Sequence, residues 1–439
     1  MFSHVKNWEL SKIGECLMII RGISFPKSAK DINYKDGLIA CLRTKNVQKE
    51  LDWNDLWFVD STFLKREEQI IKKGDILISV SNSLKLLGKV SLVKSVPYVS
   101  TLGAFIVNLR VSELLNNKFI FYYLSSLDFK NNVVENASTT TNISNISTGK
   151  LANIFIPIAP LNEQNRIVEK IEELFSDLDK ATEDLKKTQE QLKIYRQAVL
   201  KAAFEGKLLE RKYKCNFENL DELCIKITDG EHIKPNTMDK GVYFISAKDV
   251  RDNYINFDFP LYVSEEDAKK FWNRCNPERG NILIVSRGAT VGRMCVIKTE
   301  KKFCLLGSVI LLKIKKEYNN NFIYWMLNSP NIQIILLGLS GATAQQAIYL
   351  RDIKRVQIPI PIIEIQNQIV QEIESRLSVC DKLEETVQQS LNKIEYLRQS
   401  ILKKAFEGKL VPQDPNDLPV CELLKQIKIE KDKMSKNGK

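Results

Sequence analysis

The sequence is poor in the residues that build metal centres and disulfide frameworks. It has only two histidines, His4 and His232, and its nine cysteines include no Cys-x-x-Cys pair. Zinc sites need clustered cysteine and histidine ligands, and disulfide-stapled folds need cysteines in a regular framework. The sequence therefore predicts no metal site and no disulfide. Its thiols are expected to be reduced and mostly buried.

Membrane and export signals are lacking too. No apolar run approaches the roughly 18 to 20 residues that cross a bilayer. The first residues of the chain contain no apolar stretch of the kind found in signal peptides. We therefore expect a cytoplasmic protein with no membrane partner.

Catalytic motifs are missing as well. The chain contains no P-loop, no Gly-x-Gly-x-x-Gly fingerprint and no Asn-Pro-Pro-aromatic motif of amino-methyltransferases. The nearest triplet to the last motif, Asn276-Pro277-Glu278, lacks the second proline. Acidic residues on the predicted helices fit a solvated face better than a catalytic pair. The chain is not expected to be an enzyme.

What the chain does contain is an internal repeat. Residues 156–208 return as residues 358–410, at a constant offset of 202 positions. The pair Gln164-Asn165 matches Gln366-Asn367, and the hexapeptide Ala-Phe-Glu-Gly-Lys-Leu ends both copies. A duplicated unit predicts that the two halves of the chain have duplicated roles.

Each repeat has the apolar periodicity of a long helix. Apolar residues recur in alternating steps of three and four, which is the seam of a coiled coil. Each predicted helix begins after a proline, Pro160 or Pro361, and stops at a glycine, Gly206 or Gly408. Such a helix is about 66 Å long at 1.5 Å per residue. Because each seam needs a partner, we expect the two copies to pair and to hold two globular domains apart.

The repeats divide the chain into four parts. These are a first domain over residues 1–155, the central repeated helix over 156–209, a second domain over 210–357, and a C-terminal repeated helix with a tail over 358–439. Each globular segment has an ordinary domain size and can have its own core.

The formal net charge of +11 lies in the globular segments. Residues 1–150 carry 20 Lys and Arg against 14 Asp and Glu, and residues 211–357 carry 23 against 16. Two basic domains on nearly neutral helices predict a protein that binds a polyanion at two places, since phosphates supply sequence-independent affinity. General solubility of a basic protein is the alternative.

The loops of the two globular segments differ, although short strand-like runs are shared. Basic and amide side chains in these loops are candidate DNA contacts, because Arg and Lys suit guanine edges or phosphates and Asn and Gln suit adenine. Solvated side chains, polar turns and a tight hairpin at the glycine-rich loop are the alternatives. The candidates are Arg21, Lys27, Arg43, Lys45, Asn46, Lys85, Thr140, Asn142, His232, Lys234, Lys248, Arg251, Arg287, Thr290, Arg293, Gln345 and Gln346.

Together these features resemble the specificity subunit of Type I restriction-modification systems. The likeness covers essentially the whole chain and rests on the alternation of divergent and repeated regions, on the two hexapeptides and on the tail over residues 411–419. It also rests on the motif from Asp229 to His232 and on the glycine-rich loop over residues 288–292. The first segment lacks the Asp-Gly-x-His motif and has a longer loop, residues 81–88, in place of the glycine-rich one.

The resemblance implies an α+β fold, with two mixed α/β target recognition domains separated by two long helices that pair as an antiparallel coiled coil in a pseudo-twofold tandem repeat. Each domain would read one half of a bipartite target in double-stranded DNA, and the helices would set the spacer. The partners would be two methyltransferase subunits, which carry S-adenosylmethionine and flip the target adenine, and restriction subunits bound through them. This chain itself would hold no cofactor.

The resemblance also suggests where the methyltransferase docks. A two-helix coil leaves some apolar residues outside its seam, and the ends of the repeats are apolar as well. The candidate docking residues are Phe175, Phe204, Leu377 and Phe406. Changing Phe204 and Phe406 to Asp is expected to abolish methyltransferase binding while leaving the chain folded.

Three other interpretations stay open. The chain fits a stand-alone DNA-binding regulator with two modules, which would need no methyltransferase. It also fits a structural coiled-coil protein whose basic lobes bind nothing specific, or a methyltransferase fusion with unrecognised motifs. Neighbouring genes discriminate among them, because a specificity subunit is expected beside modification and restriction genes.

Overall fold

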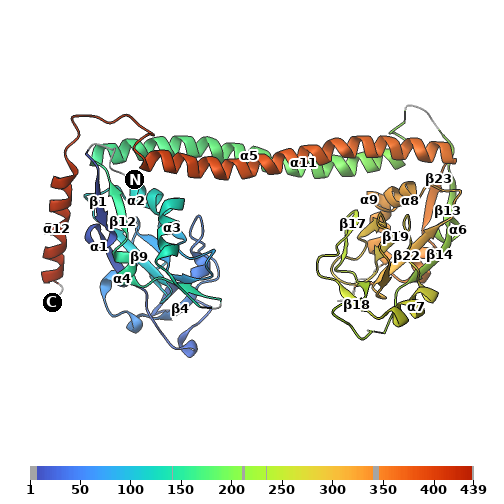
Figure 1. Ribbon diagram of the computed structural model, residues 1–439, viewed down its shortest axis with the longest axis horizontal. Helices are drawn as coiled ribbons and strands as arrows, with labels where there is room; N and C mark the ends of the chain where they lie inside the picture. The colour runs from blue at the N-terminus through green and yellow to red at the C-terminus, as the bar shows by residue number, and fades with distance from the viewer. Residues whose placement is uncertain (1–6, 141, 210–212, 234, 340–345, 438–439) are drawn as a thin grey trace. The chain divides into compact units, whose positions relative to one another are not determined.

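The computed structural model describes residues 7–140, 142–209, 213–233, 235–339 and 346–437. The chain forms two compact units, one of Met1–Asp184 with Ser390–Lys439 and one of Leu185–Gln389. Unit 1 contains the first globular domain, here called domain 1, and unit 2 contains domain 2 (Figure 1). Each unit also includes part of both long helices.

Domain 1 is built on two small sheets whose apolar residues share a core. The larger sheet has the antiparallel order β2-β9-β5-β7. In the smaller sheet, β4-β3-β8, the central strand pairs antiparallel with β4 and parallel with β8. The strands are β2 (Leu17–Arg21), β3 (Leu38–Leu42), β4 (Trp57–Asp60), β5 (Ile76–Ser79), β7 (Val90–Leu92), β8 (Ser100–Leu102) and β9 (Ile106–Val111).

Domain 2 repeats this topology strand for strand. Its larger sheet has the antiparallel order β14-β22-β19-β20, and its smaller sheet β18-β15-β21 has the same mixed pairing. The shared scaffold expected from the strand-like runs is therefore confirmed. The strands are β14 (Cys224–Asp229), β15 (Val242–Ile245), β18 (Leu261–Val263), β19 (Ile282–Val285), β20 (Met294–Val296), β21 (Phe303–Leu305) and β22 (Val309–Ile314).

Shorter elements complete each domain. In domain 1 they are α1 (Ile13–Cys16), β6 (Ser81–Asn82), α2 (Asn117–Leu124), α3 (Leu127–Glu135), β10 (Ser138–Thr139), β11 (Ser144–Asn145) and α4 (Thr148–Ala152). In domain 2 they are α6 (Leu220–Leu223), β16 (Val250–Arg251), β17 (Tyr254–Ile255), α7 (Glu265–Arg274), α8 (Asn320–Leu327), α9 (Pro330–Leu339) and α10 (Leu350–Lys354).

The repeated stretches form two 44-residue helices, α5 (Leu161–Phe204) and α11 (Ile363–Phe406), which run antiparallel side by side (Figure 1). Both begin within two residues of the expected proline. Both end just before the expected glycine, with φ of +72° at Gly206 and +67° at Gly408. Only glycine adopts this left-handed conformation without strain, so it ends the helix. The helix prediction is confirmed.

The opening of each repeat is a strand rather than part of the helix. Residues of the repeated Ile-Pro-Ile form β12 (Phe155–Ile158) and β23 (Gln357–Ile360). These strands pair antiparallel with β1 (Glu9–Lys12) and β13 (Asn216–Asn219). Proline has no backbone N–H to donate to a neighbouring strand. It is tolerated in a two-stranded edge pairing of this kind, where that hydrogen bond is not required.

The repeated Gln-Asn pair fastens the start of each long helix. The side-chain oxygen of Gln164 accepts a hydrogen bond from the backbone of Asn116 at 2.9 Å, and that of Gln366 does the same for Asn319 at 2.9 Å. Both glutamines are buried, and their amide nitrogens donate to the carbonyls of Ala159 and Pro361. A buried amide with both ends bonded is costly to disrupt, so the pair is structural.

At the repeat ends, the assignment of Phe406 as a docking residue is wrong, whereas Phe204 is only partly buried. Phe406 is 1% exposed and packs edge-on against Phe119 and Tyr123 of domain 1. Phe204 packs in the same way against Phe322 of domain 2. Each domain thus uses an aromatic residue from the end of a long helix to complete its core.

The other two docking candidates are also packed within the chain. Leu377 is 6% exposed and belongs to the core of unit 2. Phe175 is half-buried between Tyr122 of α2 and the guanidinium of Arg398. These side chains are packed because both ends of the helix pair lie against a globular domain. The heptad pattern alone does not indicate that contact.

The tail adds a last helix, α12 (Val420–Asn437), which packs on domain 1 (Figure 1). Val420 and Ile427 are buried, and Lys431 donates a hydrogen bond to the carbonyl of Leu17 at 2.9 Å. Burial lowers the pKa of Lys431. The tail is therefore part of domain 1.

All nine cysteines are free, and seven of them are buried. Burial raises the pKa of the Cys41, Cys224 and Cys295 thiols to about 12, which makes them poor nucleophiles. Among the described residues, no single helix is long and apolar enough to cross a membrane. The pair α8 and α9 reaches that length and composition together, but with a bend of 69° between them.

Two glycines allow the chain to pass very close to a neighbouring strand in the two domains. A Cβ on Gly22 would overlap the carbonyl oxygen of Gly103, and one on Gly230 would overlap that of Leu305. We predict that Gly22→Ala and Gly230→Ala each lower the free energy of unfolding by about 1–3 kcal/mol, as overpacking does. Calorimetry measures the change.

Gly149→Ala is the matched control, because a Cβ there meets nothing within 4 Å and the residue lies in a helix. Its melting temperature is expected to stay the same or rise slightly. A Gly22→Ala or Gly230→Ala protein that melts like the wild type contradicts the prediction.

Candidate nucleic-acid interface

In domain 2 the loops that follow four strands meet at one edge, here called the strand-end edge of domain 2. They follow β14, β15, β19 and β21. Backbone hydrogen bonds join the loops: Leu306 donates to Ile245 at 2.9 Å, and Ser286 donates to Ser308 at 2.9 Å. Side chains far apart in the sequence are thereby held on one surface.

Domain 1 has an equivalent strand-end edge, after β2, β3, β5 and β8. Here Gly103 donates to Leu42 at 2.9 Å, and Val80 donates to Phe105 at 3.0 Å. The edge is extended by a small sheet in which β6 pairs with β11 and β11 with β10. The two edges have the same scaffold but different side chains.

The clearest polar cluster of domain 2 is organised by Asp229. One carboxylate oxygen accepts a hydrogen bond from Arg274 at 2.6 Å, and the other lies 3.0 Å from Nε2 of His232. The Asp229 side chain is 11% exposed, whereas those of His232 and Arg274 are 44% and 47% exposed. The carboxylate raises the pKa of the Arg274 guanidinium. A mostly buried acid therefore holds two partly exposed donors in place.

The same cluster accounts for the glycine at position 307. A Cβ on Gly307 would lie 2.7 Å from Nδ1 of His232, so a larger residue would push the imidazole out of position. Sequence reasoning found His232 but missed Arg274. Arg274 ends α7, 45 residues after Asp229, and no local pattern links the two.

The other candidates of domain 2 differ in how exposed their side chains are. Lys248, Arg251, Arg287 and Gln346 are exposed; Arg287 forms an isolated bridge with Ala347 at the edge. Thr290 and Arg293 are half-buried in the loop between β19 and β20, and Arg293 lies 3.5 Å from Asp252. Lys234 and Gln345 lie outside the described residues.

In domain 1, three candidate side chains form contacts within the domain. Asn46 is wholly buried, and its amide donates to the carbonyls of Asp52 and Asn54. It cannot reach a base, so its assignment as a DNA contact is wrong. Arg43 pairs with Asp55 at 3.0 Å and stacks over Trp57, and Lys45 pairs with the same carboxylate.

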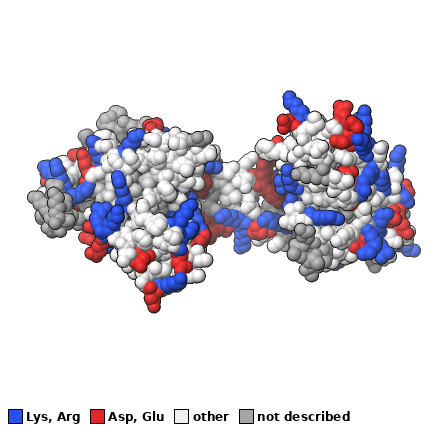
Figure 2. All heavy atoms as spheres, turned by 90° about the horizontal axis from the view of Figure 1, so that it is seen from below, with Lys and Arg blue, Asp and Glu red and all other residues white. Residues whose placement is uncertain are grey.

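The remaining candidates of domain 1 are exposed. Arg21 donates to the hydroxyl of Thr148, while Lys27 and Lys85 extend from loops. Thr140 and Asn142 lie in the turn between β10 and β11. Figure 2 shows Lys and Arg side chains on both domains, with Asp and Glu between them.

The two repeated halves of the chain match a known protein family. A family model described as the Type I restriction modification DNA specificity domain matches residues 5–193 and again residues 214–395. The chain belongs to this family.

Individual members of the family match over nearly the full length. The Type I restriction enzyme EcoKI specificity subunit of Escherichia coli (strain K12) is 28% identical over 97% of this chain and 96% of its own length. The StySPI specificity subunit of Salmonella potsdam is 26% identical over 97% of this chain and 96% of its own length.

Solved structures show the same fold. A chain from a structure of the assembly and conformational transition of the type I restriction-modification system superposes with a TM-score of 0.70 at 20% identity, over 92% of this chain and 99% of that one. The HsdS subunit from Thermoanaerobacter tengcongensis superposes with a TM-score of 0.52 at 18% identity, over 92% and 98% of the two chains.

We predict that Arg274→Gln weakens binding to target DNA by about 1–3 kcal/mol, the cost of one lost base contact, and relaxes base preference at one position. Competition binding with a library of single-base variants measures both effects. Arg279→Gln is the control, because Arg279 precedes β19 and therefore lies at its opposite end, paired with Glu300. Unchanged preference in Arg274→Gln protein removes that residue from the interface.

Proposed function

We propose that this chain is the DNA-recognition subunit of a Type I restriction-modification complex, and that each domain reads one half of a bipartite target. The observation that carries the proposal is the strand-for-strand repetition of one scaffold with two different strand-end edges. Stability alone does not account for different polar side chains at the same edge of two copies of one scaffold. Two different edges fit two different half-sites.

The paired helices are proposed to set the unread gap between the half-sites. A helix of 44 residues is about 66 Å long. A buried glutamine fastens the start of each helix, and a phenylalanine packed on a domain core fastens its end, so the length of the pair is fixed. A target with a fixed gap follows from this rigidity.

The chemistry of methylation is proposed to lie in partner subunits. The expected partners are two methyltransferase subunits that carry S-adenosylmethionine, with restriction subunits joined through them. The absence of cofactor and catalytic motifs from the sequence supports a non-catalytic role for this chain. Its contribution is to position the complex on DNA.

Of the four docking candidates, Phe406 and Leu377 are buried, and Phe175 and Phe204 are partly buried against their own units, so we propose a docking surface on the exposed face of the helices. Two exposed apolar residues stand at equivalent positions of the repeat: Ile194 on α5, 69% exposed, and Tyr396 on α11, 77% exposed. Each is followed by a second exposed apolar residue, Tyr195 or Leu397. Exposed apolar residues duplicated by the repeat fit two copies of one partner.

We predict that Ile194→Asp with Tyr396→Asp abolishes co-purification of the methyltransferase encoded beside this chain. The substitutions are at exposed positions, so circular dichroism and the melting temperature are expected to stay unchanged. Ile194→Leu with Tyr396→Phe is the matched control and is expected to retain the complex. Normal complex formation by the Asp variant places the docking surface elsewhere.

The proposed function is tested by co-expressing the chain with that methyltransferase and mapping methylated adenines across the genome. We expect a split motif, with two short specified blocks around a fixed gap. If no complex forms and the chain alone binds DNA specifically, it is a stand-alone two-module DNA-binding protein. A complex that forms but methylates no split motif contradicts the proposal that the DNA target is bipartite.

A further inference from the structure

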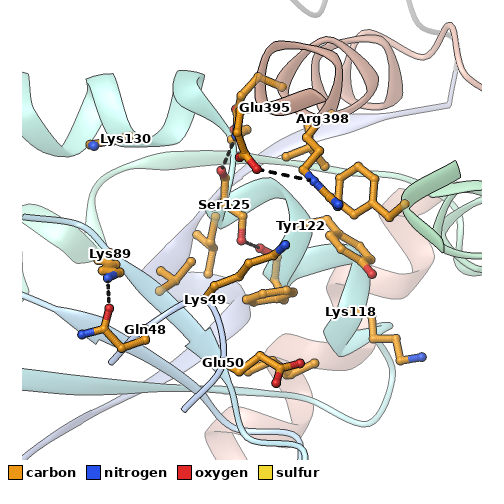
Figure 3. A pocket seen from close by; sticks show the side chains of 18 of the residues that line it. Gln48, Lys49, Glu50, Lys89, Lys118, Tyr122, Ser125, Lys130, Glu395 and Arg398 are labelled. Carbon is orange, nitrogen blue, oxygen red and sulfur yellow. Dashed lines mark hydrogen bonds and ion pairs between the residues drawn. The ribbon is translucent and has the colours of Figure 1, made fainter. Parts of the chain in front are cut away.

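Unit 1 contains a large groove between domain 1 and its part of the helix pair (Figure 3). Its volume is 1320 Å³. The walls are formed by the loops around residues 48–50 and 85–94, by α2 and α3, and by α5 and α11. All of the residues that line the groove belong to unit 1.

The groove is lined by more positive than negative side chains. Eight Lys and Arg residues face five Asp and Glu residues, which leaves a net charge of +3. The acidic residues are Glu50, Glu172, Asp179, Glu183 and Glu395. The basic residues are Lys49, Lys85, Lys89, Lys94, Lys118, Lys130, Lys180 and Arg398.

Four of the lysines are not neutralised by the groove itself. Lys89 donates to the neutral amide of Gln48, and Lys130 donates to the carbonyl of Lys85 at 3.1 Å. Within the described ranges the ammonium groups of Lys85 and Lys180 form no ion pair or hydrogen bond. By contrast, Lys94 and Lys118 are paired with carboxylates that also line the groove.

The floor of the groove holds Arg398, whose counterpart in unit 2 is Arg196. Arg196 pairs with both Asp381 and Glu384. Arg398 pairs with Asp179 at 2.7 Å and lies 3.9 Å from Glu395, while Thr182 stands where the second repeat has Glu384.

Arg398 is buried beneath the groove. It is 5% exposed, and its Nε donates no hydrogen bond to any residue that the structure describes. Lys49 lies 3.6 Å from the same carboxylate of Asp179. Arg398 and Lys49 are thus balanced by Asp179 and Glu395, and the net positive charge of the groove comes from its other lysines.

The groove and the strand-end edge of domain 1 share one loop. The loop over residues 83–89 carries Lys85 and directly follows β6, which is part of that edge. Ser79, the last residue of β5, exchanges two backbone hydrogen bonds with this loop, one with Lys89 at 2.9 Å and one with Gly88 at 3.0 Å. Lys85 and Lys89 of this loop line the groove.

We propose that this groove binds the phosphate backbone of double-stranded DNA that flanks the half-site of domain 1. A duplex presents a row of phosphates, and ammonium groups bind phosphates without regard to sequence. Lys85, Lys89 and Lys130 supply these contacts. The inference rests on the proposed DNA-recognition function and adds a sequence-independent site to it.

The test compares the full chain with the variant Lys85→Gln, Lys89→Gln, Lys130→Gln, in complex with its methyltransferase. Binding to a duplex with the methylated motif, and to one without it, is measured from low to high salt. Loss of three phosphate contacts is expected to reduce the slope of log Kd against log salt by about 2 to 3, since each contact contributes about 0.9. Both duplexes should be affected alike, and the methylated motif should not change.

The matched control is Lys409→Gln, Lys425→Gln, Lys428→Gln, which removes three exposed lysines of unit 1 that do not line the groove. It is expected to keep the wild-type slope. If the groove variant also keeps that slope, the proposal is overturned. If it binds DNA normally but loses the methyltransferase, the groove holds an acidic protein segment, which overturns it too. Failure of the wild-type complex to bind any motif would instead reject the function on which the inference rests.

Discussion

The structure depends on the way each globular core is completed by a helix end. Phe406 at the end of α11 fills the core of domain 1, and Phe204 at the end of α5 packs on that of domain 2. Removing such an aromatic leaves a cavity, which costs about 3–5 kcal/mol. The helices are therefore integral to the domains, and the hexapeptide is repeated because both domains need the same closure.

The second constraint is that the two domains share one scaffold, whereas the side chains at their strand-end edges differ. Asp229 organises two donors in domain 2, whereas the equivalent position of domain 1 holds Arg21, which bonds to Thr148. The crossing glycines Gly22 and Gly230 are retained because the backbone approach leaves no room for a side chain. Steric requirements thus preserve the framework, and the solvent-facing ends of the strands are free to differ.

Several features were predictable from local pattern. The helices, their end at glycine and the shared strands follow from periodicity and from residues with special backbone preferences, which act over a few positions. The failures involve burial. Asn46 resembled an adenine-reading amide, and Phe406 resembled a docking residue, yet both are buried. A side chain's type does not reveal whether other segments cover it.

The sequence by itself determined the repeat, the two long helices and the family, because each rests on periodicity or on direct comparison of residues. The tertiary structure alone decided which side chains meet. It joined Arg274 to Asp229, placed Arg398 between Asp179 and Glu395, and formed a basic groove beside α5. These contacts join residues separated by tens to hundreds of positions, and their energies depend on distance and burial in space, which local sequence does not encode.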